Sequence, residues 1–117
     1  MDFHAEFKKS LKRFPSLEGL IFVDPDGESI LFEAPAMDPF DVQLTGARIP
    51  ILQQHYKFSG ITSEPVFLEL QFRKRYIISV ILKQSYTITA IGKSTKERAP
   101  LKSHLWTLAT KFNEEIV

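Results

Sequence analysis

The acidic stretch VDPDGESILF, residues 23–32, carries the side chains that could bind calcium. An EF-hand loop places oxygen ligands at positions 1, 3 and 5, glycine at position 6 and glutamate at position 12. Counting from Asp24 puts Pro35 at position 12, and the glycine does not fall at position 6. Asp26 and Gly27 between two apolar runs are instead typical of a tight turn. The stretch therefore predicts a β-hairpin rather than an ion site.

Other residue types that perform chemistry are scattered along the chain. His4, His55 and His104 are far apart in sequence, and none has a second ligand at metal-binding spacing. The segment GKST (92–95) resembles the end of a phosphate-binding loop, but the glycine that this motif requires upstream of Gly92 is missing. The absence of cysteine excludes disulfides, thiol catalysis and thiolate metal sites. We therefore expect a protein without catalytic residues, cofactor or metal.

The length and net charge of the chain further restrict the classes of protein to which it can belong. The chain of 117 residues predicts a single domain, 1–117, and its 44% hydrophobic residues suffice for a core. A net charge of +1 does not favour bulk electrostatic binding to nucleic acid or to an anionic membrane. The charged N-terminal residues 1–14 lack a signal-peptide apolar stretch, and no run reaches the roughly 18 apolar residues of a membrane span. We expect a cytoplasmic protein that does not insert into membranes.

The elements that must position any functional residue follow from hydrophobic periodicity. Helices are expected where apolar residues recur every three or four positions, and strands where they alternate or form short runs. The expected order is helix 3–14, strands 20–23 and 29–32, a helix from 39 to about 58, strands 66–72, 76–82 and 86–92, and helix 101–116. This order predicts an α+β fold, with one antiparallel five-stranded sheet and helices on both faces.

The middle helix carries two apolar stripes, about 150° apart on a helical wheel. One comprises Phe40, Leu44, Ala47, Ile51 and Phe58; the other comprises Val42, Thr45, Ile49, Leu52 and Tyr56. One stripe can cover the chain's own sheet, and we expect the second to pack against another chain. The alternative is that the loop 59–65 or the curvature of the sheet covers it. Pro50 inside this helix predicts a kink or break.

The segment LEGLIFVDPDGESIL (17–31), the helix that starts at Pro39 and the three-strand meander resemble the Roadblock/dynein light-chain domain family. The resemblance extends over nearly the whole chain. It implies a homodimer, or a heterodimer with a related domain, in which the middle helices pair and the strand 66–72 adds edge to edge with its copy. It also implies a non-enzymatic scaffold or regulator that binds a small Ras-like GTPase.

These expectations assign residues to two surfaces. The expected dimer-interface residues are Val42, Ile49, Leu52, Tyr56, Val66, Phe67 and Glu69. The expected polar contacts to a partner are Arg48, Gln53, Gln54, His55 and Lys57. The Arg-Lys-Arg connection 73–75 and Lys83 form either a solvated pair of hairpin ends or a contact with an acidic partner or lipid headgroup. Trp106 either flanks the core or anchors a partner.

An alternative function belongs to another class of protein. A PAS- or profilin-like small-ligand sensor or interaction module would need a pocket between sheet and helix. Phe22, Phe32 and Phe67 are the residues expected to line such a pocket.

Overall fold

The computed structural model describes residues 1–56 and 66–116, with the side chains of residues 55 and 56 excepted. The predicted order of helices and strands is confirmed. The elements are α1 (Phe3–Arg13), β1 (Leu17–Val23), β2 (Ser29–Glu33), α2 (Pro39–Tyr56), β3 (Val66–Gln71), β4 (Tyr76–Ile81), the short 3-10 helix η1 (Lys83–Ser85), β5 (Thr87–Gly92) and α3 (Arg98–Asn113).

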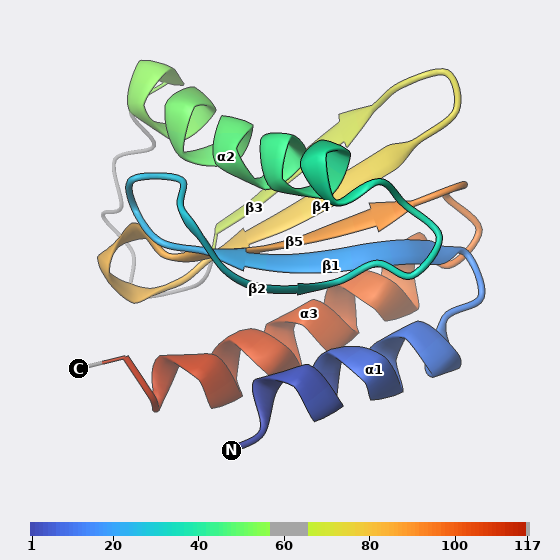
Figure 1. The fold of residues 1–117 in the computed structure, drawn as a ribbon, viewed down its shortest axis with the longest axis horizontal. Coiled ribbons are helices and arrows are strands. Elements are labelled where there is room, and N and C mark those ends of the chain that lie inside the picture. Colours follow the sequence, from blue (N-terminus) through green and yellow to red (C-terminus); the bar gives the residue numbers. More distant parts are fainter. Residues whose placement is uncertain (57–65, 117) are drawn as a thin grey trace.

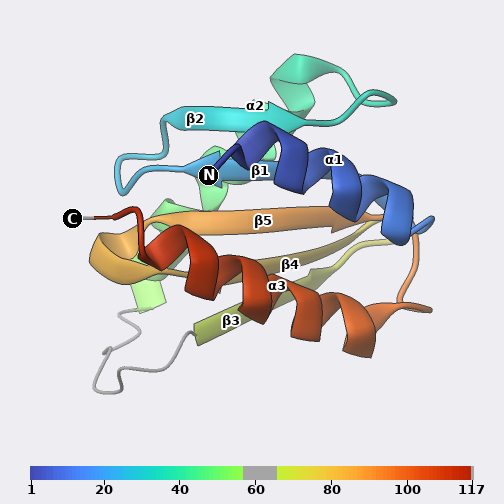
Figure 2. The same ribbon diagram turned by 90° about the horizontal axis from the view of Figure 1, so that it is seen from below.

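The strands form one antiparallel sheet in the order β2-β1-β5-β4-β3. Helices α1 and α3 lie side by side on one face, and α2 crosses the other face (Figure 1, Figure 2). Strand β5 occupies the centre, between β1 from the N-terminal half of the chain and β4, the strand directly before it in sequence. Strands β2 and β3 are the two edges of the sheet. The predicted α+β architecture with helices on both faces is confirmed.

The larger core lies between the sheet and the pair α1 and α3. Residues pointing to this side alternate along each strand, as the pleat requires. The core contains Phe7, Phe14, Leu20, Phe22, Tyr76, Ile78, Val80, Ile88, Ala90, Leu101, Leu105, Leu108 and Phe112, among others. The ring of Phe112 lies at its centre. The distances from its centroid to the ring centroids of Phe3, Phe7 and Phe22 are 4.2, 5.6 and 5.1 Å. Aromatic packing thus anchors α1 and α3 to the sheet.

A smaller core lies beneath α2. It is formed by Ile21, Val23, Met37, Val42 and Ile91. Gly46 allows the close approach of helix to sheet: a Cβ atom there would lie 3.0 Å from side-chain atoms of Ile21 and Val23. Helix α2 therefore sits mainly over β1, β2 and β5.

The acidic stretch forms the turn between β1 and β2. The Asp24 carboxylate oxygen Oδ1 accepts hydrogen bonds from the backbone N–H groups of Asp26 and Glu28, both at 2.9 Å. Gly27 has a φ of +85°, and a Cβ there would lie 3.2 Å from the carbonyl oxygen of Ala47. The hairpin prediction is confirmed, and the turn also packs against α2.

Pro50 does not break the middle helix. A single helix runs from Pro39 to Tyr56, and Pro50 faces the buried side. Proline removes one backbone hydrogen bond from a helix, but packing over the sheet holds the two halves in one element. Of the kink or break expected at this position, the break is therefore wrong.

Candidate functional site

Helix α2 buries one apolar stripe and exposes the other, and the sequence prediction of which stripe faces outward is wrong. Val42 is 0% and Ile49 1% exposed, so neither can contribute to a dimer interface as expected. Phe40, at 67% exposed, marks the outward stripe. The physical reason is Gly46, which lies on the Val42 and Ile49 side and lets only that side approach the sheet closely.

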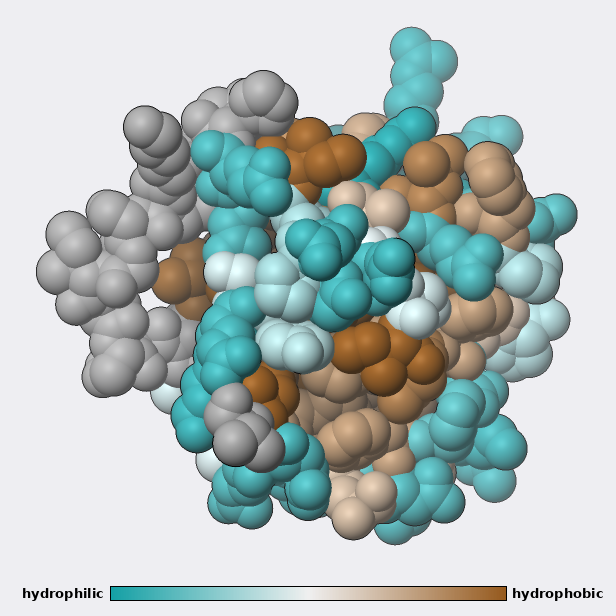
Figure 3. Space-filling model, turned by 60° about the vertical axis from the view of Figure 1, so that its left-hand side comes forward, coloured by the Kyte–Doolittle hydropathy of each residue, from teal (hydrophilic) through white to brown (hydrophobic). Residues whose placement is uncertain are grey.

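The outward stripe is therefore the apolar surface that α2 offers to another molecule. It consists of Phe40, Leu44, Ala47 and Ile51, and we call it the α2 stripe. On the side of the molecule that carries the β1–β2 turn and the end of α2, apolar surface is exposed between hydrophilic side chains (Figure 3). Phe40, Leu44 and Ile51 are exposed, whereas Ala47 is half-buried beside the β1–β2 turn. Exposed apolar side chains gathered on one helix face are typical of interaction sites.

Strand β3 is the second feature of this surface. It pairs with β4 over all six residues from Val66 to Gln71 without a register shift, and no strand of the described residues pairs with its other edge. Its sequence VFLELQ contains no proline and one charged residue, Glu69. Natural edge strands usually carry charges, prolines or bulges that prevent pairing with another strand. β3 lacks most of these protections.

The one charge of β3 is directed inward, toward α3. Arg98 donates from Nε to Glu69 Oε1 at 2.7 Å and from Nη2 to Oε2 at 3.0 Å, and Lys102 Nζ lies 3.3 Å from Oε2. The Tyr76 hydroxyl donates to Oε1 as well. The hydrogen bonds from Arg98, and secondarily from Tyr76 and Lys102, lower the pKa of Glu69 to about 2 against the opposing effect of burial. Glu69 thus fixes β3 to α3 and does not project along the edge.

The same face of β3 carries an aromatic pair. The Phe67 ring stacks on Trp106 with centroids 6.2 Å apart, and Lys102 Nζ lies 5.1 Å from the Phe67 centroid. Trp106 remains 42% exposed. Phe67 and Glu69, both expected at a dimer interface, therefore point to the α3 side of the edge, and only their backbone lies along it.

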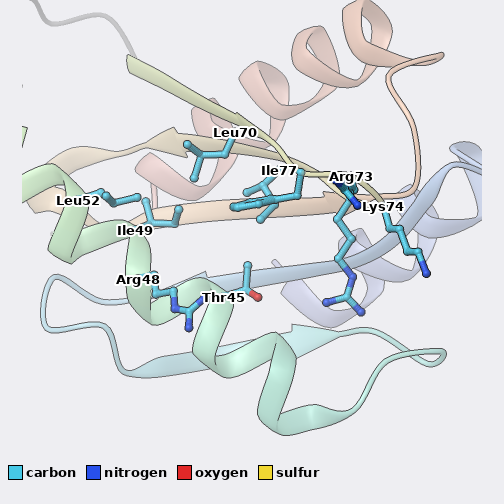
Figure 4. Close-up of a pocket in the computed structure, with 10 residues that line it drawn as sticks. Thr45, Arg48, Ile49, Leu52, Leu70, Arg73, Lys74 and Ile77 are labelled. Carbon is cyan, nitrogen blue, oxygen red and sulfur yellow. The ribbon is translucent and has the colours of Figure 1, made fainter.

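A groove separates α2 from the β3–β4 hairpin (Figure 4). Its volume is about 660 Å³. Its apolar lining consists of Ile49, Leu52, Leu70, Phe72 and Ile77, and its polar lining of Thr45, Arg48, Arg73, Lys74 and Arg75. Among the described residues, 1–56 and 66–116, no acidic side chain belongs to this lining. We call it the basic groove.

The other residues predicted as partner contacts do not form one cluster. Arg48 is exposed at the basic groove, and Gln54 is exposed on α2. Gln53 turns toward the sheet, where its Nε2 lies 3.4 Å from Ser85 Oγ. The side chains of His55 and Tyr56, and all of Lys57, lie outside the described residues.

Two further residues expected at the dimer interface are partly accessible. Leu52 is half-buried in the basic groove, and Val66 is half-buried at the start of β3.

The three phenylalanines expected to line a ligand pocket do not come together. Phe22 lies in the core beneath α1 and α3, whereas Phe32 packs against the core beneath α2 on the opposite face of the sheet. The three phenylalanines therefore cannot line one cavity. What sequence reasoning missed is Phe72, a 56% exposed residue in the lining of the basic groove. Its position directly before the Arg-Lys-Arg turn was the available signal.

Within residues 1–56 and 66–116, no cluster of three or more His, Cys, Asp or Glu side chains could hold a metal ion. His4 Nδ1 lies 3.0 Å from a Glu33 oxygen, while His104 lies between α1 and α3. Within the same ranges, no helix is both long enough and apolar enough to cross a bilayer.

Comparisons with known proteins identify the architecture. Neither a scan against protein-family models nor a search of curated proteins finds a match. Among solved structures, a Roadblock/LC7 domain from Streptomyces avermitilis has a TM-score of 0.81 and 11% identity, covering 99% of this chain and 98% of that chain. MglC from Myxococcus xanthus has a TM-score of 0.68 and 13% identity, covering 99% and 100%. A structure of MglB has a TM-score of 0.70 and 13% identity, covering 97% and 89%. This chain has the Roadblock/LC7 fold.

Proposed function

We propose that this protein is a non-enzymatic, cytoplasmic, dimeric scaffold that binds and regulates a small Ras-like GTPase. The partner in the dimer is a second copy or a related domain of the same fold. The fold and the family resemblance supply the class of partner. The two exposed features of the structure, the edge strand β3 and the α2 stripe, supply the surfaces.

The observation that carries the proposal is the open edge of β3. An unprotected edge strand presents a row of backbone N–H and C=O groups that a second strand can satisfy. The six-residue ladder to β4 is regular, so the outer edge is straight enough to pair. Glu69, its one charge, is held by Arg98 and Lys102. Antiparallel pairing of two β3 strands would join two sheets into one.

Such a dimer brings the two α2 helices to the same side of the joined sheet. Each helix then presents its α2 stripe on that side, and these two stripes are the apolar surfaces that we propose contact a GTPase. A self-associated neighbour is in keeping with this arrangement, because one structure of MglB shows that protein in a tetrameric arrangement. The solvent-exposed Phe40 and Ile51 are the residues that the proposal places at the GTPase contact.

Light scattering tests the dimer. We expect the wild type to have twice the chain mass of 13.4 kDa. Leu68→Lys places a charge on the β3 edge and should give a folded monomer. Ile30→Lys is the matched control, because Ile30 lies on the opposite edge strand β2, and this variant should remain a dimer. A monomeric wild type, or loss of the dimer in both variants, would refute pairing through β3.

Binding assays test the GTPase contact. Purified Ras-like GTPases encoded in the same genome, loaded with fluorescent GDP or a non-hydrolysable GTP analogue, should bind the wild type. Phe40→Asp with Ile51→Asp should abolish binding without unfolding the protein, because both side chains are already exposed. Ile30→Asp should bind normally. If no such GTPase binds in either nucleotide state, the GTPase assignment is wrong.

A further inference from the structure

The two faces of the sheet are covered unequally. Neighbouring strands lie about 4.8 Å apart and packed helices about 10 Å apart, so a five-stranded sheet has room for two helices on each face. Helices α1 and α3 fill one face (Figure 2). On the other face α2 lies over β1, β2 and β5, and within the described residues no helix covers β3 and β4. The basic groove is the resulting gap.

The walls of the gap suit a helix. Thr45, Arg48, Ile49 and Leu52 come from one flank of α2, at spacings of three and four, and form one wall. Leu70 and Ile77 lie on the β3 and β4 side (Figure 4). An amphipathic helix recognises such a groove by inserting residues at spacings of three, four and seven. Phe72, an exposed aromatic side chain, also lines the groove.

The charged side chains that line the gap are all basic. Arg48, Arg73, Lys74 and Arg75 rim the groove. Within residues 1–56 and 66–116, no acidic side chain forms an ion pair with any of these four. By contrast, the cations Arg98 and Lys102 on the opposite face are both paired with Glu69. Unpaired like charges around an apolar groove favour an occupant of opposite charge.

We propose that the basic groove binds an acidic amphipathic α-helix of a partner protein. The α2 helix of a second copy fits this charge less well, because it carries Asp41 and Arg48 and so brings no net negative charge. The partner helix would place apolar residues on Leu52, Leu70 and Ile77 and glutamates or aspartates against the Arg-Lys-Arg turn. The groove shares Leu70 with β3, but it uses the side of the strand that faces α2 rather than its backbone edge, so its occupant adds a third contact to the proposed scaffold.

A designed peptide provides the probe. It has about 16 residues, or about 24 Å of helix, with leucines on one face and glutamates on the other. Two control peptides carry the same residues in scrambled order, or lysine in place of glutamate. Fluorescence anisotropy should show binding of the acidic amphipathic peptide only, and its affinity should fall as salt rises, because the rim charges are exposed.

Protein variants locate the site. Arg73→Glu with Lys74→Glu and Arg75→Glu should weaken binding about tenfold or more, since three exposed ion pairs are lost. The turn itself should survive, because its hydrogen bond joins the backbone N–H of Phe72 to the carbonyl of Arg75 at 2.8 Å. The matched control is Lys8→Glu with Lys9→Glu and Lys12→Glu on α1, which changes the net charge equally on the opposite face.

A second pair of variants tests the apolar part of the site. Phe72→Ala should weaken peptide binding severalfold, whereas Trp106→Ala, also an exposed aromatic, should leave it unchanged. Equal binding of the scrambled or basic peptide would overturn the proposal, as would equal losses in the control variants. Binding of anionic phospholipid vesicles but not of the peptide would assign the groove to membranes instead.

The same samples separate this proposal from the dimer. If peptide affinity falls with protein concentration in the wild type but not in Leu68→Lys, a second copy occupies the groove and the partner-helix proposal is wrong. If a monomeric wild type still binds the peptide, the dimer proposal fails and the groove proposal stands.

Discussion

Ile49 and Ile51 lie two positions apart on α2, yet Ile49 is 1% exposed and Ile51 is 54% exposed. The first packs toward the sheet and the second belongs to the α2 stripe. Ile49→Ala should therefore lower the free energy of unfolding by about 2–4 kcal/mol. Ile51→Ala should change it by less than about 0.5 kcal/mol. Urea denaturation of the two variants measures the difference, and similar losses would mean that the helix is oriented differently.

Gly46 sets the distance between α2 and β1. An added Cβ would lie 3.0 Å from Ile21 Cδ1 and Cγ2 and from Val23 Cγ1, on branched side chains that cannot easily move away. Gly46→Ala normally favours a helix by about 1 kcal/mol, but here overpacking should outweigh that gain and leave a net loss of roughly 1 kcal/mol. The melting temperature of Gly46→Ala, compared with that of the wild type, shows whether the substitution stabilises or destabilises the protein. A raised melting temperature would show that the helix can shift outward at little cost.

The ion pair of Glu69 predicts a pH dependence of stability. Its pKa falls from 4.5 to about 2 in the folded protein, because Arg98, Tyr76 and Lys102 donate to the carboxylate. The folded state thus binds fewer protons, and this contribution is complete above about pH 4.5 and lost as pH falls toward 2. Glu69→Gln should reduce the free energy of unfolding at pH 7 by roughly 1 kcal/mol.

The wild type and Glu69→Gln should become equally stable near the pKa of Glu69 in the folded protein, about 2. Urea denaturation between pH 7 and that value measures the gap. The exposed turn residue Glu28 supplies the control, since Glu28→Gln should change stability by less than about 0.5 kcal/mol. A gap that is independent of pH would assign the loss to packing rather than to charge.

His104 links α3 to α1 in its neutral form. Ser10 Oγ donates its single proton to the Glu6 carbonyl at 2.9 Å, so His104 Nε2, 2.6 Å away, is the donor in that contact. The unprotonated Nδ1 then faces Arg13 Nη1 at 3.4 Å. Burial, and then the positive charge of Arg13, lower the pKa of His104 below 6.5.

Stability should therefore fall as pH drops below 6.5, where the unfolded chain takes up a proton that the folded imidazole binds less readily. Nearby Glu6 partly offsets this effect, and Lys111 adds to it. Denaturation curves between about pH 7 and pH 5 should show this slope in the wild type and a smaller one in His104→Gln. NMR titration of the imidazole should place its midpoint below that of a model histidine; a midpoint above it would contradict the assigned geometry.

Local patterns in the sequence were sufficient to predict the order and type of the main helices and strands. The Asp26-Gly27 turn, the stripe that includes Phe7 on α1 and the nearly continuous apolar run of β4 each use a short-range rule, and each prediction is confirmed. The order of elements then restricted the fold to a single sheet. These predictions hold because backbone geometry and side-chain period act within a few residues.

The orientation of α2 could not be predicted in the same way. Its two stripes are similarly apolar, so periodicity alone does not distinguish Val42 from Phe40. The deciding residue is Gly46, whose missing side chain is informative only when Ile21 and Val23 are known to lie opposite. Likewise, the basic groove joins Arg48 to the turn 73–75 across a long sequence separation. Tertiary proximity of this kind has no local signal in one sequence.

The strand order also has a consequence for synthesis of the chain. The sheet is joined at its centre by β5, whose residues pair with β1 from Leu17↔Gly92 to Val23↔Thr87. Until residue 92 has left the ribosome, the β1–β2 and β3–β4 hairpins have no strand to connect them, and the core of Phe7 and Phe112 cannot close. Long-range pairing of this kind slows folding. We therefore expect a nascent chain that ends before β5 to expose both hairpins to chaperones, and folding to be completed only after most of the protein has been translated.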